Sequence, residues 1–305
     1  MSTDFKAYIA GLVQNFANNG ISAEEKDLQY GRQLVLTSGS DKTTLSVYNG
    51  KKGIKLVWSG KNTDFTDKCK SVLIQEDAAG VDYRLLKDFP DFQGIWAGSD
   101  ESGKGDFIGP LVVAAVICNE KSAAQLFNLG VKDCKIVSDK DVLKLRTEIE
   151  KTALATSVLA LMPKMYNYRY SQIKAAGQNL NHLLSSGHAA ALCAALAKCP
   201  QCNYALVDRF AANNNIRGMV NAKFPQVNVV QMPRAEADIA VAAASVLARA
   251  KFLRIMAELE AQAGMPLPKG GGPAATDCAH MLAQKFGKDA LGNFVKLHFA
   301  NYKRI

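Results

Sequence analysis

The stretch that decides the fold reads IWAGSDESGKGDFIGPLVVAAV and occupies residues 95–116. It places two adjacent carboxylates, Asp100 and Glu101, between an apolar run and a glycine-lysine-glycine turn. Successive side chains of a strand point to opposite faces, so both acids can serve one site only where the strand ends or bulges. The stretch therefore predicts a strand end that presents acids to a phosphate-bearing substrate, followed by a buried strand over residues 111–117.

Residues 98–104 also match the first seven positions of a P-loop, GxxxxGK. The eighth position of a P-loop is Ser or Thr, which holds magnesium, whereas this chain has Gly105. Two carboxylates in a loop that cradles phosphates would repel them, and the long apolar run follows this loop instead of preceding it. Nucleotide hydrolysis is therefore kept only as a secondary hypothesis.

The segment from residue 98 to residue 110 resembles the first motif of the type 2 ribonucleases H, and in particular that of bacterial ribonuclease HIII. Further segments follow in the order of the family, so the resemblance extends from about residue 94 to the end of the chain. They are GVKDCK at 130–135, SD at 138–139, YN at 166–167, NHLL at 181–184, GHA at 187–189, LVD at 206–208, RAE at 234–236, AAAS at 242–245, AR at 248–249 and KLHFAN at 296–301. The family usually has Asp-Ser-Lys where this chain has DCK, and the spacing from Glu236 to Ser245 is slightly shorter than the family pattern.

The resemblance implies a ribonuclease H-like α/β catalytic domain over residues 89–305, with a mixed sheet and flanking helices. It also implies an endonuclease that cleaves the RNA strand of RNA/DNA hybrids. Ribonuclease HII, which acts at a single embedded ribonucleotide, is the near alternative. The additional domain before residue 89 and Ser102 in the first motif favour ribonuclease HIII. A loop at residues 268–273, PKGGGP, lies either near the substrate or merely between two helices.

Residues 1–88 are predicted to form a small α+β domain. Residues 5–18 have apolar side chains along one stripe of a helix, and a second helix is expected over residues 64–75. Three segments alternate polar and apolar residues as strands do: 30–36, 42–48 and 52–58. This arrangement is similar to the TATA-binding-protein-like domain that precedes the catalytic domain of ribonuclease HIII, and the resemblance implies a sheet that binds the hybrid duplex.

The net charge of +9 indicates a polyanionic partner. The excess lies after residue 90, where 25 Lys and Arg face 17 Asp and Glu. In the N-terminal part, seven lysines lie between residues 42 and 70. With Tyr48 and Trp58 they are candidates for contacts with the hybrid, although a solvated face and core aromatic residues would look similar.

The sequence has no transmembrane segment and no secretory signal, so we expect a cytoplasmic protein without a membrane partner, acting as a monomer. Cys199 and Cys202 form a lone C-x-x-C pair. A zinc site needs a second pair at a defined spacing, so we expect reduced structural cysteines.

Two further acids are candidates for the site. Asp208 follows an apolar run and is expected at the end of a buried strand, where open α/β sheets place their chemistry. Glu236 is expected in the turn before a long Ala-rich helix, whose N-terminus favours negative charge. Asp238 would cap this helix at least as well by position and stays the alternative. The family carries its last acid after a pair similar to residues 234–235, so the resemblance selects Glu236.

The resemblance thus brings four acids together as catalytic residues and metal ligands: Asp100, Glu101, Asp208 and Glu236. Their hard oxygen ligands suit two Mg²⁺ or Mn²⁺ ions better than zinc. Two such ions can activate a water, align it with a phosphodiester and stabilise the leaving oxygen. His182 and His188 lie on one predicted helix without a third ligand in register, so both are expected in the core or at the surface, as is His298.

Substrate choice is expected to depend on the glycine-lysine-glycine turn, whose backbone can approach a 2′-hydroxyl that only RNA possesses. The resemblance implies that this is how the family separates RNA from DNA. The candidate substrate-binding residues are Ser102, Gly103, Lys104, Gly105, Lys135, Tyr166 and Asn167. Because all four acids are present, a non-catalytic nucleic-acid-binding protein is the weaker alternative outside the enzymes.

Overall fold

The computed structural model describes residues 3–50, 53–59, 64–66, 68–69, 72, 84–134, 137–209 and 215–305. The chain forms two compact units, Met1–Asp82 and Tyr83–Ile305. The boundary lies before the predicted one at residue 88, because the residues that follow it already pack in the second unit. Leu86 is fully buried in the core of that unit, and the hydroxyl of Tyr204 donates to the carbonyl oxygen of Pro90.

The first unit packs α1 (Thr3–Asn18) on an antiparallel sheet of order β1-β2-β3-β4. Its strands are β1 (Ser22–Leu28), β2 (Gly31–Ser38), β3 (Asp41–Gly50) and β4 (Gly53–Ser59). The predicted helix and three strands are confirmed, whereas β1 was missed because its sequence, SAEEKDL, is polar and largely exposed. Of the helix expected over residues 64–75, the described residues 64–66, 68–69 and 72 are helical, and Phe65, Cys69 and Val72 pack in the core of this unit. The other residues of this prediction lie outside the described ones.

The second unit is built on a mixed five-stranded sheet of order β7-β6-β5-β8-β9. Its strands are β5 (Ile95–Ser102), β6 (Leu111–Asn119), β7 (Ala155–Leu161), β8 (Tyr204–Asp208) and β9 (Asn228–Met232). The β7-β6-β5 pairs are antiparallel and the β5-β8-β9 pairs are parallel. The predicted α/β sheet is therefore confirmed.

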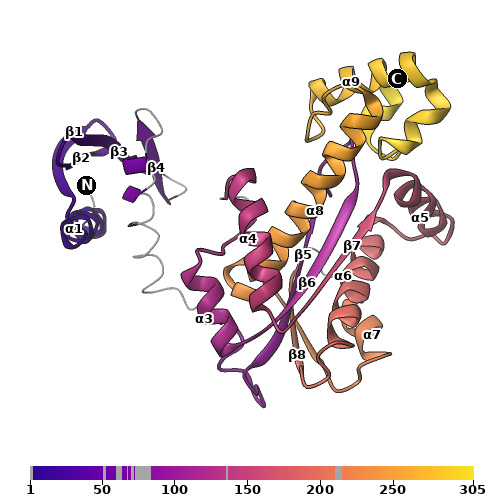
Figure 1. The fold of residues 1–305 in the computed structure, drawn as a ribbon, viewed down its shortest axis with the longest axis horizontal. Helices are drawn as coiled ribbons and strands as arrows, with labels where there is room; N and C mark the ends of the chain where they lie inside the picture. The colour runs from indigo at the N-terminus through magenta and orange to yellow at the C-terminus, as the bar shows by residue number, and fades with distance from the viewer. Residues whose placement is uncertain are drawn as a thin grey trace. The chain divides into compact units, whose positions relative to one another are not determined.

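Helices cover both faces of this sheet. They are α3 (Glu120–Asn128), α4 (Asp139–Thr152), α5 (Pro163–Ala175), α6 (Leu180–Leu196), α7 (Ile216–Asn221), α8 (Ile239–Ala263) and α9 (Pro273–Phe286), with 3-10 turns η2 (Ala235–Ala237), η3 (Lys288–Asn293) and η4 (Ala300–Arg304). The β5–β6 pair lies between α8 and α6 (Figure 1). A Cβ added to Gly98 would lie 2.3 Å from the backbone N of Val241, so glycine at this position lets α8 approach β5. The sequence did not predict α5, whose apolar residues form no clear stripe, or the short α7.

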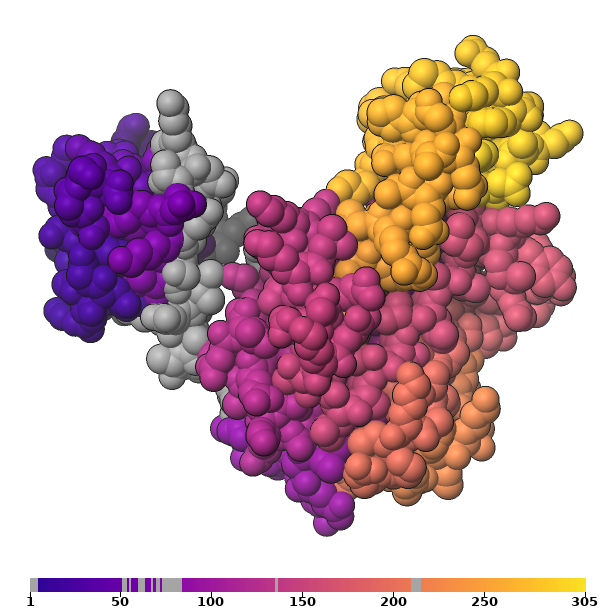
Figure 2. All heavy atoms as spheres, in the orientation of Figure 1, coloured from indigo at the N-terminus to yellow at the C-terminus, as the bar shows by residue number. Residues whose placement is uncertain are grey.

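Each strand of the sheet contributes alternate residues to two separate cores. Val112 and Ala114 of β6 belong to the core on the α8 side, whereas Val113 and Ala115 belong to the core on the α6 side. In Figure 2 the C-terminal part, in orange and yellow, projects from the body of this unit. None of the described helices combines the length and the hydropathy needed to cross a membrane.

Candidate active site

Asp100 and Glu101 lie near the end of β5, where one neighbouring strand has already stopped pairing. Asp100 stands opposite Ala114 and Glu101 opposite Val113 in regular antiparallel register, so the alternative of a bulge is wrong here. On the other side, the parallel pairing with β8 ends at Ser99. The side chains of Asp100 and Glu101 point to opposite faces of β5. Because β8 no longer pairs with β5 at these two positions, both side chains can reach the open space where that pairing ends.

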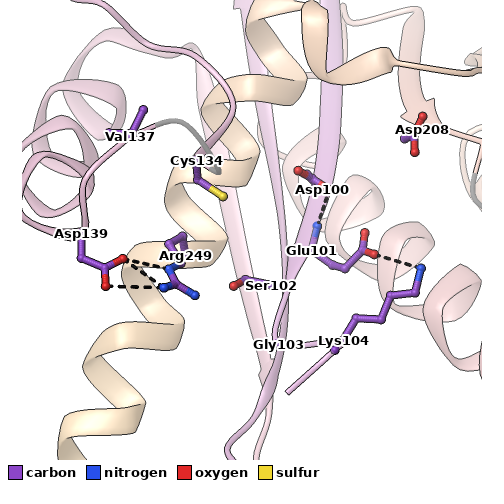
Figure 3. A pocket seen from close by; sticks show the side chains of 11 residues that line it. Asp100, Glu101, Ser102, Gly103, Lys104, Cys134, Val137, Asp139, Asp208 and Arg249 are labelled. Atoms are coloured by element: carbon purple, nitrogen blue, oxygen red, sulfur yellow. Dashed lines mark hydrogen bonds and ion pairs between the residues drawn. The ribbon is translucent and has the colours of Figure 1, made fainter. Parts of the chain in front are cut away.

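A hollow of about 650 Å³ opens at this edge. Its lining residues are Asp100, Glu101, Ser102, Gly103, Lys104, Gly105, Cys134, Val137, Asp139, Asp208 and Arg249. Figure 3 shows Asp100, Glu101 and Asp208 on one side, with Asp139 and Arg249 across from them. Three of the four predicted acids thus meet at one place with the predicted glycine-lysine-glycine turn.

This arrangement is not a P-loop. Residues 98–102 belong to β5, and the turn after them leads into β6. A P-loop joins a strand to a helix whose N-terminus binds phosphate. The nucleotide-hydrolase hypothesis is therefore wrong.

Glu101 is held by two side chains. Its Oε2 lies 3.1 Å from Nε2 of His188, and its Oε1 lies 3.5 Å from Nζ of Lys104. Burial opposes ionisation of Glu101, but the hydrogen bond and charge of His188, with the charge of Lys104, outweigh burial and lower the pKa to about 2. Glu101 is therefore a carboxylate at neutral pH.

His188 lies in the core, one of the two places expected for it, but its contact with the site was missed. Its Nδ1 lies 2.9 Å from Oγ of Ser99, while its Nε2 bonds to Glu101. The signal in the sequence was the place of His188 in the GHA segment at 187–189.

Asp208 is the last residue of β8. Leu206 belongs to the core on the α8 side, so alternation points Asp208 to the same side of the sheet as Asp100. Its Oδ1 accepts a long hydrogen bond of 3.5 Å from the backbone N of Ala235. Glu236 follows directly in η2 and is half-buried, but it is not among the residues that line the hollow.

Asp238 serves the structure, as its position before α8 suggested. Its carboxylate accepts hydrogen bonds from the backbone N of Ala240 at 2.9 Å, Nε1 of Trp96 at 2.9 Å and the backbone N of Leu85 at 3.1 Å. Burial raises the pKa of Asp238 to about 6, although these hydrogen bonds oppose the shift. Asp238 therefore caps α8 and ties it to β5 and to the start of the unit.

The backbone conformation of the turn after β5 is restricted at Gly103. Gly103 has a φ of 90°, and a Cβ there would lie 2.2 Å from the carbonyl oxygen of Pro110. The PKGGGP loop packs against this turn, because the backbone N of Gly270 donates to Oδ1 of Asp106 at 2.6 Å. The loop thus supports the turn and does more than join two helices.

Lys296 fastens the same turn from the C-terminal segment. Its side chain is fully buried, and Nζ donates to the carbonyl oxygens of Asp106 at 2.7 Å and Gly109 at 2.8 Å. Nζ also lies 5.5 Å from the ring centroid of Tyr166. Burial lowers the pKa of Lys296 to about 7.

Two predicted substrate-binding residues lie away from the hollow. Tyr166 is 1% exposed and stacks on Tyr170. The side chain of Asn167 donates to the carbonyl oxygen of Val295 at 2.8 Å and accepts from the backbone N of Leu297 at 2.9 Å. Both residues join α5 to the C-terminal segment and neither lines the hollow, so their role as substrate contacts stays a prediction.

The DCK segment is only partly visible, because Lys135 lies outside the described residues. Cys134 lines the hollow, and its backbone N donates to Oγ of Ser245 at 3.0 Å. Burial raises the pKa of the Cys134 thiol to about 11, so it remains a thiol. Cys199 and Cys202 are buried free thiols, as expected.

The negative charge of Asp139, across the hollow, is balanced by two cationic side chains. It accepts from Nζ of Lys269 at 2.6 Å, and Nη2 of Arg249 lies 3.0 Å from its Oδ1. Partial burial opposes ionisation of Asp139, but these two cations prevail and lower its pKa. Asp139 is therefore a link between α4 and α8, not a further free acid of the site.

The donors around the hollow fit a hard cation, since they are carboxylate oxygens with Glu101 fixed in its ionised form. Within the described ranges, no three His, Cys, Asp or Glu side chains are gathered closely enough to hold one ion. Asp100, Glu101 and Asp208 thus line one hollow in this conformation without forming a coordination shell.

A family model described as ribonuclease HII matches residues 97–302. Ribonuclease HIII of Protochlamydia amoebophila (strain UWE25) is 38% identical over 208 residues, which cover 68% of this chain and 67% of that protein. Ribonuclease HIII of Bacillus cereus (strain AH187) is 38% identical over 217 residues, covering 68% and 67%.

Solved structures agree on the fold. The crystal structure of Bst-RNase HIII in complex with Mn²⁺ covers 98% of this chain and 95% of its own, with a TM-score of 0.65 at 23% identity. Aquifex aeolicus RNase H3 covers 97% of each chain, with a TM-score of 0.55 at 23% identity. The resemblance read from the sequence is confirmed, and the chain belongs to the type 2 ribonuclease H family and, within it, to the bacterial ribonucleases HIII.

Proposed function

We propose that this ribonuclease H cleaves the RNA strand of RNA/DNA hybrids internally, using carboxylates that hold two divalent metal ions. Membership in the family makes the chain a hydrolase of phosphodiester bonds. The observation that carries the assignment of the site is the meeting of Asp100, Glu101 and Asp208 with the glycine-lysine-glycine turn at one hollow.

The metal ligands we assign are Asp100, Glu101, Asp208 and Glu236. Carboxylate oxygens are the ligands that Mg²⁺ and Mn²⁺ prefer, and a solved relative, Bst-RNase HIII, contains Mn²⁺. When bound, two such ions activate a water and stabilise the charge on the leaving oxygen. A carboxylate binds a metal in its ionised form, and the low pKa of Glu101 keeps it in that form at neutral pH.

Glu236 is the fourth acid in this proposal, and Asp238 is not. The three hydrogen bonds that Asp238 accepts leave its buried carboxylate committed to Trp96, Leu85 and the first turn of α8. Glu236 is half-buried, next to the backbone N that donates to Asp208.

The turn after β5 is proposed to select RNA. Gly105 has open space where a side chain would stand, so a sugar can approach its backbone closely. Lys104 is 40% exposed and can turn from Glu101 to a phosphate of the substrate. Ser102 lines the same hollow and completes the proposed substrate contacts.

The decisive experiment compares four labelled duplexes of equal length in Mg²⁺ and in Mn²⁺. They are an RNA/DNA hybrid, a DNA duplex with one ribonucleotide, an RNA duplex and a DNA duplex. We expect cleavage within the RNA strand of the hybrid, loss of cleavage with EDTA, and none of the DNA duplex. Absence of hybrid cleavage in both metals would refute the proposal, and preference for the single ribonucleotide would indicate a ribonuclease HII-like activity.

The N-terminal unit is proposed to supply affinity for the hybrid and no chemistry. Lysines that neutralise phosphates release counterions, so the logarithm of affinity falls with the logarithm of salt by about 0.9 per phosphate contact. A protein that begins at Tyr83 keeps Leu86 and the residues that pack in the second unit. We expect it to show a higher KM, a shallower salt slope and a similar kcat. An unchanged slope and KM would mean that the N-terminal lysines form only a solvated face.

A further inference from the structure

One face of β5 carries a chain of hydrogen bonds that ends on a proposed metal ligand. Ser99 and Glu101 are two residues apart, so their side chains point to the same side of the strand, toward α6. The imidazole of His188 spans them, with Nδ1 2.9 Å from Oγ of Ser99 and Nε2 3.1 Å from Oε2 of Glu101.

The ring of His188 has little freedom to turn. His188 is 1% exposed and Ser99 is fully buried, so neither side chain exchanges its partner with bulk water. Both ring nitrogens are engaged at opposite ends of the imidazole. A hydrogen bond to one ring nitrogen fixes the ring and so orients what the other nitrogen holds.

A glycine brings α6 close enough for this contact. A Cβ added to Gly187 would lie 3.0 Å from Cγ2 of Val113, which is tighter than ordinary packing. Val113 is the residue of β6 paired with Glu101. The close approach of α6 to β6 therefore occurs beside the acid that His188 holds.

The two oxygens of Glu101 have different partners. Oε2 faces the buried imidazole, whereas Oε1 faces Nζ of Lys104, whose side chain is 40% exposed. The Lys104 side of this ion pair is open to solvent, whereas the imidazole of His188 is buried. Oε1 is therefore the oxygen that can change its cationic partner while Oε2 stays fixed.

We propose that Ser99 and His188 are positioning residues that hold Glu101 through Oε2 and so present Oε1 to a divalent cation in place of Lys104. This inference depends on the proposed role of Glu101 as a metal ligand. Residues that orient a metal ligand from behind commonly affect metal affinity and activity by about 10- to 100-fold. His188 touches neither metal nor substrate in this scheme.

The test measures Mn²⁺ binding without substrate, by electron paramagnetic resonance, together with kcat and KM on the hybrid. We expect His188→Ala to weaken Mn²⁺ binding and to lower kcat by about 10- to 100-fold, with KM for the hybrid little changed. His188→Gln, whose amide can still donate to Glu101, should recover part of the loss. Ser99→Ala should act in the same direction with a smaller effect.

Two controls separate positioning from helix stability. The described partners of Glu101 are His188 and Lys104, so His182→Ala, which alters another histidine of the same helix, should leave Mn²⁺ affinity and kcat unchanged. In the Glu101→Gln background, His188→Ala should cause no further loss of Mn²⁺ affinity, because its target is already gone.

Wild-type Mn²⁺ affinity and kcat in His188→Ala would overturn the inference, as would equal losses in His182→Ala and His188→Ala. If His188→Ala does not fold, Ser99→Ala and His188→Gln still test the positioning role. Normal Mn²⁺ binding and normal kcat in both variants would overturn the inference. Failure of the wild type to cleave the hybrid would refute the proposed function instead, while the comparison of Mn²⁺ affinities would still test His188.

Discussion

The two sides of β5 hold their acids by different means. On the α6 side, Glu101 is fixed by side chains from elsewhere in the chain and the next turn, with His188 buried behind it. On the α8 side, Asp100 accepts from the backbone N of Glu101 at 2.8 Å, and Asp208 accepts a long hydrogen bond from a backbone N. The difference shows that Glu101 is oriented by a buried side chain from α6, whereas Asp100 and Asp208 share a position near the ends of β5 and β8.

The largest expected effect comes from the two acids on the α8 side. Asp100→Asn and Asp208→Asn each remove one carboxylate charge from the hollow with little change of shape. Loss of an electrostatic contribution to the transition state commonly costs about 10²- to 10³-fold in rate, and we expect at least this loss in both variants. Single-turnover cleavage of the hybrid measures it. A near-normal rate in Asp208→Asn would show that β8 does not share the site with β5.

A smaller effect is expected from the two substitutions that distinguish the roles of Glu236 and Asp238, the acids before α8. Glu236→Gln should lower kcat strongly at unchanged stability. Asp238→Asn replaces one carboxylate oxygen by an amide donor, which would face a donor such as the backbone N of Leu85. We expect a loss of about 1–3 kcal/mol in the free energy of unfolding, measured by urea, with activity retained where the protein is folded. The reverse pattern would make Asp238 the ligand and Glu236 a surface residue.

The smallest effect concerns Lys296, which supports the turn after β5. Burial lowers its pKa from 10.5 to about 7, so between pH 7 and pH 10.5 the unfolded chain binds more protons than the folded one. This group therefore makes folding more favourable as the pH rises through that window. Thermal unfolding at pH 7 and pH 9 should show the wild type gaining stability relative to Lys296→Met. Parallel curves would mean that Lys296 stays charged in the folded protein, held by its two carbonyl acceptors.

Much of the fold followed from local patterns. The strands at residues 111–117 and 204–207 are apolar runs of ordinary strand length, and the helices after residues 138 and 238 begin at capping side chains. β1 could not be predicted, because an exposed edge strand needs no apolar alternation. The contacts of Tyr166 with Lys296 and His298 could not be predicted either, because burial against a distant segment is not visible in a two-residue motif.

The sequence by itself determined the chemistry of the site: adjacent acids before a glycine turn, an acid after each of two apolar runs, and no competing metal-ligand set. Only the tertiary structure decided which of these groups are available. In the folded protein, Asp238 caps α8 and Asp139 pairs with two cations. His188, which is 87 residues from Glu101 in the sequence, forms a hydrogen bond with it. The physical reason is that composition and spacing fix what a side chain can do, whereas burial and partners far along the chain fix whether its charge is free to do it.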